Sequence, residues 1–360
     1  MKAMVIGLGN IGSAVARLLA ALLRADGDER HEIVLVDHDV YDPGNLGSQM
    51  IEKDDVGRNK AIAQARKLRG LSPKSKISAF PFRLEHLPLG VFADCDVVFT
   101  CLDSKAARVA ANERVWRSGA AAWFDTGVSP DSRLARVSIF RPGTEAPCLE
   151  CGWGEPEYAS LEVSHPCGGI AAPSTGAPAA LGCLAASLAV LEFEKLLRGE
   201  GDAVNWNKEI IVSATAHTHL ETTLRRDTRC RFDHRTVQAE RVEVNSREVT
   251  LGDLWSRFGA DDSALRVEGG RWLTTLVCGA CRVSQPTLTV KGRGLAEAAF
   301  CPACGAGRMV PSGFHQKDAI TRADVGDEQL GLPLSRLGIR PREIVTFSRP
   351  DQTTHSLMLP

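Results

Sequence analysis

Four cysteines in the last quarter of the chain have the spacing of a metal site. Cys278 and Cys281 form one Cys-x-x-Cys pair, Cys301 and Cys304 form another, and nineteen residues separate the two pairs. Two tight turns that each present two thiolates make the tetrahedral sulfur site that Zn2+ prefers. The spacing therefore predicts a structural zinc ribbon over about residues 273–310.

A glycine-rich turn near the start of the chain has the residues of a phosphate site. Gly7, Gly9 and Gly12 follow the apolar run Lys2–Ile6 and open an apolar stretch with helical spacing. The first glycine allows a tight turn, the second lets the backbone approach phosphate, and the third lets the helix pack on the strand. The helix amides then face an anion. With Asp37 after the next strand, this pattern predicts a nucleotide site that fits NAD and ATP equally well.

Strand-like and helix-like segments alternate through the first third of the chain. The runs that predict strands are Lys2–Ile6, Ile33–Val36, Ile77–Phe82, Val97–Cys101 and Ala122–Phe124. The stretches that predict helices are Ala14–Leu23, Lys60–Arg69 and Ala106–Arg117. Such alternation predicts an α/β domain with a doubly wound, mostly parallel, Rossmann-like sheet.

The pattern changes after Asp125. A strand is predicted at Leu134–Phe140, followed by a loop over about residues 142–176 that is rich in Gly, Pro and Cys, and by a helix at Ala180–Arg198. His217 and His219 are expected to share one face of a later strand. We place the end of the first domain at residue 235, and the short strands predicted in 236–360 indicate a smaller β-rich domain around the zinc ribbon.

The segment between Asp37 and Lys60 helps to decide between NAD and ATP as the nucleotide that this site binds. It reads Asp37-x-Asp39, then Asn45-Leu46-Gly47-Ser48-Gln49, then Asp55-Val56-Gly57-Arg58-Asn59-Lys60. Together with the glycine turn and Asp103, it resembles the adenylation domain of the ubiquitin-activating enzyme family, which includes the ThiF, MoeB and HesA proteins. The resemblance covers roughly residues 2–234.

The resemblance implies a set of nucleotide-binding and catalytic residues. In that family the strand-end carboxylate holds the ribose, an Asn and a Gln line the pocket, a lysine contacts the phosphates, and a later aspartate works with Mg-ATP. The corresponding residues are Asp37 with Asp39, then Asn45, Gln49, Lys60 and Asp103. The implied reaction is attack by a carboxylate on the α-phosphorus of ATP, which gives an acyl-adenylate and pyrophosphate. Arg108 and Asn112 also match family positions, although a role as plain helix surface fits them equally well.

Two features differ from the family pattern. Ser48 stands where the family usually has an arginine, and the first strand begins at residue 2, where members commonly carry a preceding helical segment. Arg58 is the nearest candidate to replace the missing charge. A nucleotide-binding scaffold without turnover therefore remains an alternative.

The resemblance also implies a second zinc site. Cys148 and Cys151 occupy the place where many members have half of such a site, and Cys230 with His234 matches the other half. Thiolate and imidazole both suit zinc. Asp233 in place of His234, or no metal at all, are the alternatives.

Cys167 is the candidate nucleophile. It lies in Ser164-His165-Pro166-Cys167-Gly168-Gly169 and matches the position where ubiquitin-activating members form a thioester with the activated chain. His165 could lower the pKa of this thiol, and a buried or incidental thiol is the competing interpretation. The remaining cysteines, Cys95, Cys101 and Cys183, are expected in the core.

Composition limits the partners. The 43 basic and 44 acidic residues give a net charge of -1, so no overall field attracts nucleic acid or anionic lipid. Neither a signal peptide nor a membrane span is expected, and paired thiols fit a reducing cytoplasm.

Our leading hypothesis is an ATP-dependent activating enzyme, dimeric through its adenylation domain, that passes a glycine-terminated ubiquitin-like protein to a conjugating enzyme. A sulfur-carrier adenylyltransferase is the main alternative, and an NAD-dependent oxidoreductase is the weakest.

Overall fold

The chain folds into two compact units. The computed structural model describes residues 1–162, 177–293, 299–312 and 314–360. The first unit comprises residues 1–84 and 92–236, and the second comprises 85–91 and 237–360. Nothing in the sequence pattern indicated that residues 85–91 group with the second unit.

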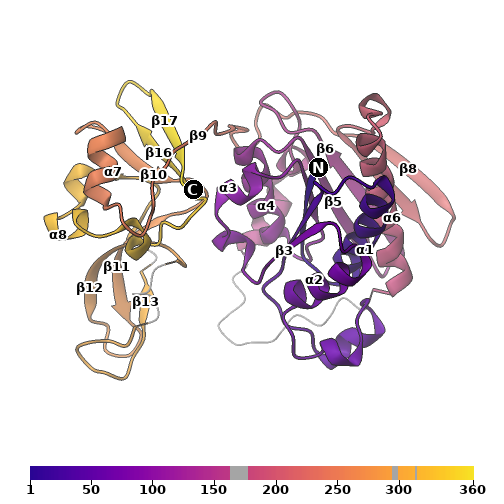
Figure 1. Ribbon diagram of the computed structural model, residues 1–360, viewed down its shortest axis with the longest axis horizontal. Helices are drawn as coiled ribbons and strands as arrows, with labels where there is room; N and C mark the ends of the chain where they lie inside the picture. Colours follow the sequence, from indigo (N-terminus) through magenta and orange to yellow (C-terminus); the bar gives the residue numbers. More distant parts are fainter. Residues whose placement is uncertain (163–176, 294–298, 313) are drawn as a thin grey trace. The chain divides into compact units, whose positions relative to one another are not determined.

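The first unit is built on an eight-stranded sheet (Figure 1) with the order β3-β2-β1-β4-β5-β6-β7-β8. Its strands are β1 (Lys2–Ile6), β2 (Glu32–Val36), β3 (Lys76–Phe80), β4 (Val97–Thr100), β5 (Ala122–Ser129), β6 (Leu134–Phe140), β7 (Lys208–Ser213) and β8 (Thr218–Thr223). The five strands from β3 to β5 in this order are parallel, and β6, β7 and β8 are antiparallel to their neighbours. The predicted α/β class with a mostly parallel sheet is confirmed.

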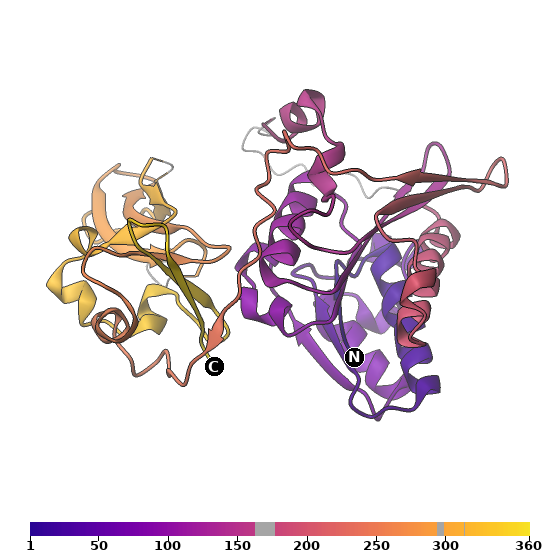
Figure 2. The ribbon, with the colours of Figure 1, turned by 90° about the horizontal axis from the view of Figure 1, so that it is seen from above.

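Helices cover both faces of this sheet (Figure 2). The helices of this unit are α1 (Asn10–Asp26), α2 (Lys60–Leu71), α4 (Lys105–Ser118), α5 (Glu155–Glu162) and α6 (Ala179–Leu197), while α3 (Leu89–Ala93) begins within residues 85–91 of the second unit. On one face, α1, α2 and α6 share a core with the sheet, where Phe193 meets Phe99 edge to face. On the other face, Trp116 of α4 packs against Trp123. Because β1 and β4 are covered on both sides, they are apolar along almost their whole length.

The most apolar described helix, α6, does not meet the requirements of a membrane-spanning helix. Within the described parts of the chain, no helix is both long enough and apolar enough to cross a bilayer. The helix α6 carries Glu192, Glu194 and Lys195 in its last turns.

The pair of histidines expected on one strand is not found. His217 has a φ of 53° and lies in the turn between β7 and β8, because β8 begins only at Thr218. His219 therefore lies on β8 without His217, and the prediction that the two share a strand face is wrong.

The second unit is β-rich, as expected. One sheet has the order β15-β10-β16-β17-β9, and a smaller one has β12-β11-β13 with β14 also paired to β11. The elements are β9 (Glu240–Arg241), α7 (Leu251–Phe258), β10 (Ala264–Val267), β11 (Trp272–Cys278), β12 (Ser284–Val290), β13 (Met309–Pro311), β14 (Gln316–Lys317), β15 (Ile320–Thr321), α8 (Asp327–Leu330), β16 (Ile344–Ser348) and β17 (Thr354–Met358). The strands β10, β13, β14, β15 and β17 were not predicted from the sequence.

A fully buried ion pair lies inside the second unit. Arg293 Nη1 lies 2.7 Å from Glu343 Oε1, and both side chains have no exposed surface. The same guanidinium approaches the carbonyls of Glu85 and Gly269. This contact helps to explain why residues 85–91 belong to this unit.

We expect Glu343→Gln to lower the free energy of unfolding by about 3–5 kcal/mol, because it leaves the Arg293 charge buried without its counter-charge. Urea unfolding followed by tryptophan fluorescence measures this change. The control is Asp318→Asn, which removes the pair between Arg271 and Asp318, whose side chains are more than half exposed, and should cost less than about 1 kcal/mol. Equal effects of the two variants would contradict this account.

Candidate functional site

The glycine turn lies at the switch point of the parallel sheet. In the strand order, β1 stands between β2 and β4, where ligands of open α/β sheets bind beyond the strand ends. Gly7 has a φ of 81°, and a Cβ at Gly12 would lie 1.7 Å from the Gly7 carbonyl oxygen. A Cβ at Gly9 would meet only the Gln49 amide, at 3.8 Å. Gly7 and Gly12 therefore fix the turn, while Gly9 leaves its backbone open to a ligand.

Asp37 binds this turn to the end of β2. Its two carboxylate oxygens accept the N–H groups of Leu8, at 2.6 Å, and Asp39, at 2.8 Å. The side chain is almost fully buried, and burial raises the pKa of Asp37, although the two N–H donors and Lys60 act in the opposite direction. The Asp37 carboxylate therefore fixes the conformation of the glycine turn.

Asn59 and Tyr41 support the site and were not identified from the sequence. Asn59 caps α2, and its Nδ2 also donates to the carbonyls of Asp37 and Asp39. The Tyr41 hydroxyl donates to the Leu8 carbonyl at 2.9 Å. Lys60, the first residue of α2, lies 3.3 Å from Asp39 Oδ2. The helix start thus holds the lysine beside the carboxylates that follow β2.

The side chains of Asn45 and Gln49 differ in their hydrogen bonding. The Asn45 side chain accepts the Asp42 N–H at 3.1 Å and caps a short 3-10 turn, so it shapes the segment from within. The Oε1 atom of Gln49 is buried and has no hydrogen-bond partner among the described residues. Gln49 adjoins the open Gly9 through its Nε2 atom, and its oxygen still lacks a hydrogen-bond donor.

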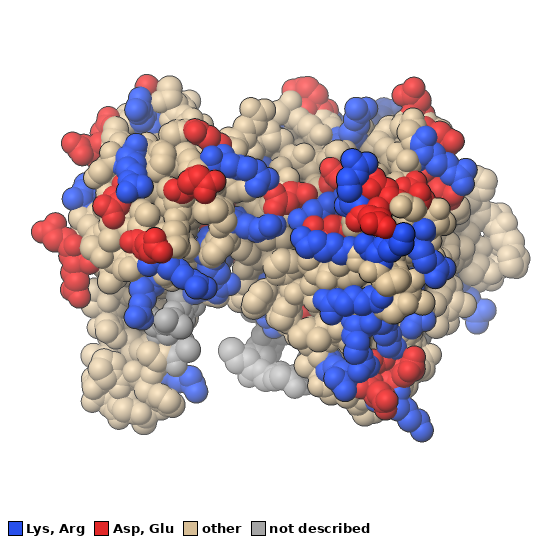
Figure 3. Space-filling model, viewed as in Figure 1, with Lys and Arg blue, Asp and Glu red and all other residues tan. Residues whose placement is uncertain are grey.

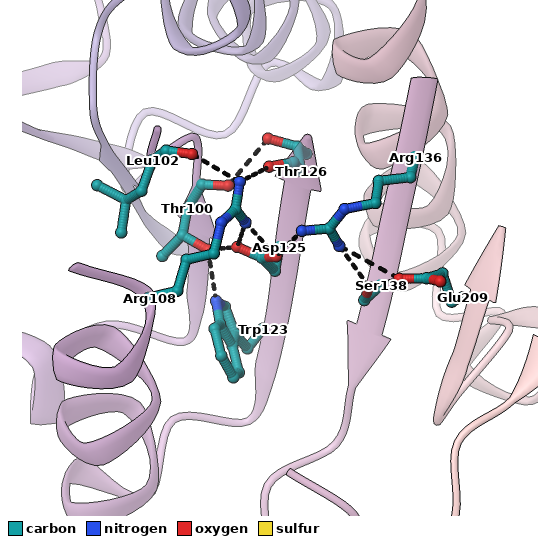
Figure 4. A network of polar contacts seen from close by, with 9 residues as sticks. All are labelled: Thr100, Leu102, Arg108, Trp123, Asp125, Thr126, Arg136, Ser138 and Glu209. Atoms are coloured by element: carbon teal, nitrogen blue, oxygen red, sulfur yellow. Dashed lines mark hydrogen bonds and ion pairs between the residues drawn. The ribbon is translucent and has the colours of Figure 1, made fainter. Parts of the chain in front are cut away.

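Arg108 is held in a polar network and is not a plain helix-surface residue (Figure 4). Its guanidinium pairs with Asp125, which is fully buried, and donates to the carbonyls of Leu102 and Thr126. The bond to Leu102 fixes the chain just before Asp103, which is exposed beyond the end of β4. Arg108 therefore positions the loop that carries Asp103.

The network continues across the antiparallel strands (Figure 4). Arg136 bridges Asp125, at 3.0 Å, and Glu209, at 3.2 Å. Burial opposes its charge, but the two carboxylates outweigh burial and raise the pKa of Arg136. A Cβ at Gly127 would lie 2.9 Å from Arg136 Nε, so this glycine leaves room for the side chain to cross β5.

Three cysteines and a histidine come together as one cluster in the first unit. The ligand atoms of Cys148, Cys151, Cys230 and His234 all lie within 4.8 Å of one another. The Nδ1 atom of His234 is 3.1 Å from the Ala146 carbonyl, which leaves Nε2 to face Cys151 Sγ at 3.5 Å. Three thiolates and one imidazole are a donor set that fits tetrahedral zinc.

Asp233 does not face this cluster. Its two oxygens accept the two terminal nitrogens of Arg117, at 2.6 and 2.9 Å. A bidentate pair of this kind occupies the carboxylate, so the geometry favours His234 over Asp233 as the fourth ligand.

Asn112 fastens the Cys148–Cys151 turn to α4. It is fully buried, donates to Glu150 Oε1 at 2.9 Å and accepts the Leu149 N–H at 3.3 Å. The Tyr158 hydroxyl donates to the other oxygen of Glu150. Burial raises the pKa of Glu150, and the bonds from Asn112 and Tyr158 partly offset this. Asn112 is therefore a supporting residue of the cluster and not helix surface.

The second cluster gathers the four cysteines of the predicted ribbon. The Sγ atoms of Cys278 and Cys304 are 3.7 Å apart, as are those of Cys281 and Cys301. The N–H groups of Ala280 and Cys281 point at Cys278 Sγ. Four thiolates with backbone N–H support fit a closed structural zinc site.

Of the remaining cysteines, three lie in or against the core, and one lies outside the described residues. Cys95 is buried, and Cys101 and Cys183 pack against the core. Burial raises the pKa of both Cys95 and Cys101 to about 12, which keeps them as unreactive thiols. Cys167, the candidate nucleophile, lies outside the described residues.

A parallel sheet that presents a glycine turn and a buried carboxylate at its switch point defines the nucleotide-binding α/β proteins. Within that class, the sequence profile of the ThiF family matches residues 1–232. The chain belongs to the ThiF family.

Relatives support this placement. An adenylyltransferase and sulfurtransferase UBA4 of Meyerozyma guilliermondii is 30% identical over 180 residues, which cover 49% of this chain and 39% of that protein. A ubiquitin-like modifier-activating enzyme 5 of Aedes aegypti is 26% identical over 160 residues, which cover 41% of this chain and 38% of that one. The chain thus spans less than half the length of these curated relatives.

Solved structures share the fold. E. coli MccB with AMPCPP and selenomethionine MccA gives a TM-score of 0.50 at 22% identity, covering 64% of this chain and 66% of that chain. MccB with ATP gives 0.50 at 21% identity, covering 64% and 65%.

We expect the purified chain to bind about two zinc ions, one at each cluster. His234→Ala should reduce this to about one, because three remaining thiolates hold zinc less tightly. Metal analysis after gel filtration measures the stoichiometry. Asp233→Asn is the matched control and should retain both ions, and zinc loss from Asp233→Asn but not from His234→Ala would reverse the ligand assignment.

Proposed function

We propose that this chain uses ATP to adenylate the C-terminal carboxylate of a ubiquitin-like or carrier protein. Family membership supports adenylate chemistry, and the unsatisfied Gln49 oxygen beside the open Gly9 carries the argument that a ligand completes this site. The nucleotide would lie over the glycine turn, with its ribose toward the Asp37 loop and its phosphates toward the start of α1 and Lys60.

In this reaction the chain mainly positions the reactants and stabilises the charge that develops on the phosphates. A carboxylate oxygen of the substrate attacks the α-phosphorus, and the bond from that phosphorus to the bridging oxygen breaks, so pyrophosphate leaves with the negative charge. Lys60 would stabilise the charge that grows on the phosphates. Mg2+, when bound, would neutralise part of the same charge, and the exposed Asp103 is the carboxylate that would hold it.

In this proposal Asn45 does not contact the nucleotide directly. Its side chain is already bonded to the Asp42 backbone, so it would shape the pocket while Gln49 contacts the nucleotide. Arg108 would act by keeping Asp103 in place through the Leu102 carbonyl.

A thioester step would follow in the ubiquitin-activating version of this function. The Cys167 thiolate would attack the acyl carbon of the adenylate, and AMP would leave. The acyl group would then pass to a cysteine of a conjugating partner. A homodimer through the adenylation domain, and zinc at both cysteine clusters as a structural metal, belong to the same proposal.

A sulfur-carrier adenylyltransferase is the second candidate. The UBA4 relative is named for both adenylyltransferase and sulfurtransferase activities. In that version a sulfide-level sulfur nucleophile would attack the acyl carbon of the adenylate and AMP would leave, which gives a thiocarboxylate, so no thioester on Cys167 would be needed.

We expect Lys60→Ala to lower carrier-dependent ATP–pyrophosphate exchange by about 100-fold or more, because it removes a positive charge from the transition state. Lys74→Ala is the control, since Lys74 is exposed and pairs with Glu29, and should leave exchange unchanged. Wild-type chain that binds ATP but shows no exchange with any glycine-terminated carrier would instead identify a scaffold.

We expect mass spectrometry to detect a reductant-labile adduct of carrier and chain after incubation with Mg-ATP. Cys167→Ala should abolish this adduct while pyrophosphate exchange continues, since adenylation does not need the thiol. Cys183→Ala, which alters a half-buried thiol on α6, should retain it. An adenylate without any adduct in the wild type would favour the sulfur-carrier function.

A further inference from the structure

The first residue of α1 joins this helix to the start of α6, beside the glycine turn. Asn10 directly follows Gly9 in the chain. Its Nδ2 atom donates to the carbonyls of Ala177, at 2.9 Å, and Pro178, at 3.2 Å, and Pro178 is the N-cap residue of α6. One short side chain therefore fixes the N-terminal end of α6 to that of α1, and the two helices lie side by side (Figure 1).

Gly182 leaves the space that the Asn10 side chain occupies. A Cβ at Gly182 would lie 2.1 Å from Oδ1 and 2.6 Å from Cγ of Asn10. Glycine inside a helix is less favourable than alanine, and Gly182 is buried in a helix where alanine is otherwise frequent. The close approach of Asn10 explains why a glycine stands at this position.

The first turn of α1 carries free backbone donors. Its N-cap residue, Gly9, offers no side chain, and the first backbone hydrogen bond runs from the Ser13 N–H to the Gly9 carbonyl at 3.1 Å. The N–H groups of Asn10, Ile11 and Gly12 have no hydrogen-bond partner among the described residues. Such donors at a helix N-terminus suit a phosphate group. Asn10 therefore belongs to this donor turn and, through its side chain, also holds α6.

A triphosphate would depend on such local donors. On the face of the first unit that Figure 3 shows, basic and acidic side chains are interspersed, and the whole chain has a net charge of -1. No overall field therefore draws an anion towards the glycine turn. The affinity for phosphate groups would come from Lys60 and from the orientation of the N–H groups in the first turn of α1.

Two contacts fix the chain on either side of the open Gly9. Before it, the Leu8 N–H is held by the Asp37 carboxylate at 2.6 Å. After it, Asn10 is held by the carbonyls at the start of α6. Donors that are fixed before a ligand arrives lose less conformational freedom when they bind it.

We propose that Asn10 is a positioning residue of the phosphate site, which holds the first turn of α1 in the orientation that receives the triphosphate of ATP. The Asn10 side chain acts through the carbonyls of Ala177 and Pro178 and does not contact the nucleotide. This inference rests on the proposed function, because it requires that ATP binds over the glycine turn.

Binding of Mg-ATP and of adenosine to the full chain tests the proposal. Isothermal titration calorimetry measures the dissociation constant of Mg-ATP, and a ligand-observed NMR titration measures that of the more weakly bound adenosine. We expect Asn10→Ala to weaken Mg-ATP binding by about tenfold, since it removes two hydrogen bonds that hold the phosphate donors. Adenosine has no phosphate, so its affinity should remain unchanged. Equal losses for the two ligands would indicate a general structural effect and would overturn the proposal.

A second variant reaches the same contact from the other helix. Gly182→Ala should weaken Mg-ATP binding to a similar extent, because its Cβ would displace the Asn10 side chain. In the Asn10→Ala background, where that space is empty, Gly182→Ala should have little further effect. Fully additive losses would contradict the proposed role of this contact.

Asn245→Ala is the matched control. Asn245 is an asparagine of the second unit whose Nδ2 donates to Glu248, and its replacement should leave both affinities unchanged. Each variant should keep the wild-type zinc content and circular dichroism spectrum. Wild-type chain that binds no Mg-ATP would refute the proposed function itself, whereas undiminished Mg-ATP binding by Asn10→Ala would overturn only this inference.

Discussion

The buried carboxylate of Asp37 is the contact on which the nucleotide site depends. An ionised carboxylate away from water is unfavourable unless donors replace the lost hydration. Here the N–H groups of Leu8 and Asp39 supply two such donors, and Lys60 adds a nearby positive charge. The same bonds fix the glycine turn to the end of β2, so the requirement to satisfy one charge also sets the shape of the turn. A ligand therefore meets amides that are already oriented, which lowers the cost of binding it.

A second buried carboxylate supports the other side of the switch point. Asp125 follows the same rule as Asp37 but is satisfied by two arginines, together with the Thr100 hydroxyl at 2.7 Å. Because Arg108 comes from α4 and Arg136 from β6, this one carboxylate connects the parallel and antiparallel parts of the sheet. The loop before α4 is thereby fixed from the protein interior, and the exposed Asp103 remains available to solvent or ligand.

Local patterns in the sequence predicted the parts of the site whose chemistry is local. The glycine turn and the Cys-x-x-Cys pairs have fixed spacing because each must fit one tight turn, and the central strands are recognisable because burial on both faces requires continuous apolar residues. Asn59 and Tyr41 were missed because their partners, the Asp39 and Leu8 carbonyls, become neighbours only in the folded sheet. Residues 85–91 gave no signal for a similar reason. The Gly90 N–H bonds to the Arg342 carbonyl, and a backbone contact of this kind leaves no mark on residue type. The strand β17 is exposed at its start and buried at its end, so it lacks the alternation that identifies strands.

The two units differ in what holds them together. The first unit has a large apolar core between α1, α2, α6 and one face of the sheet. Among its described residues, the ribbon has a separate core of five buried residues, two of which, Cys278 and Cys301, are also predicted metal ligands. A core this small rarely stabilises a fold alone, and coordination of a metal would supply the missing free energy.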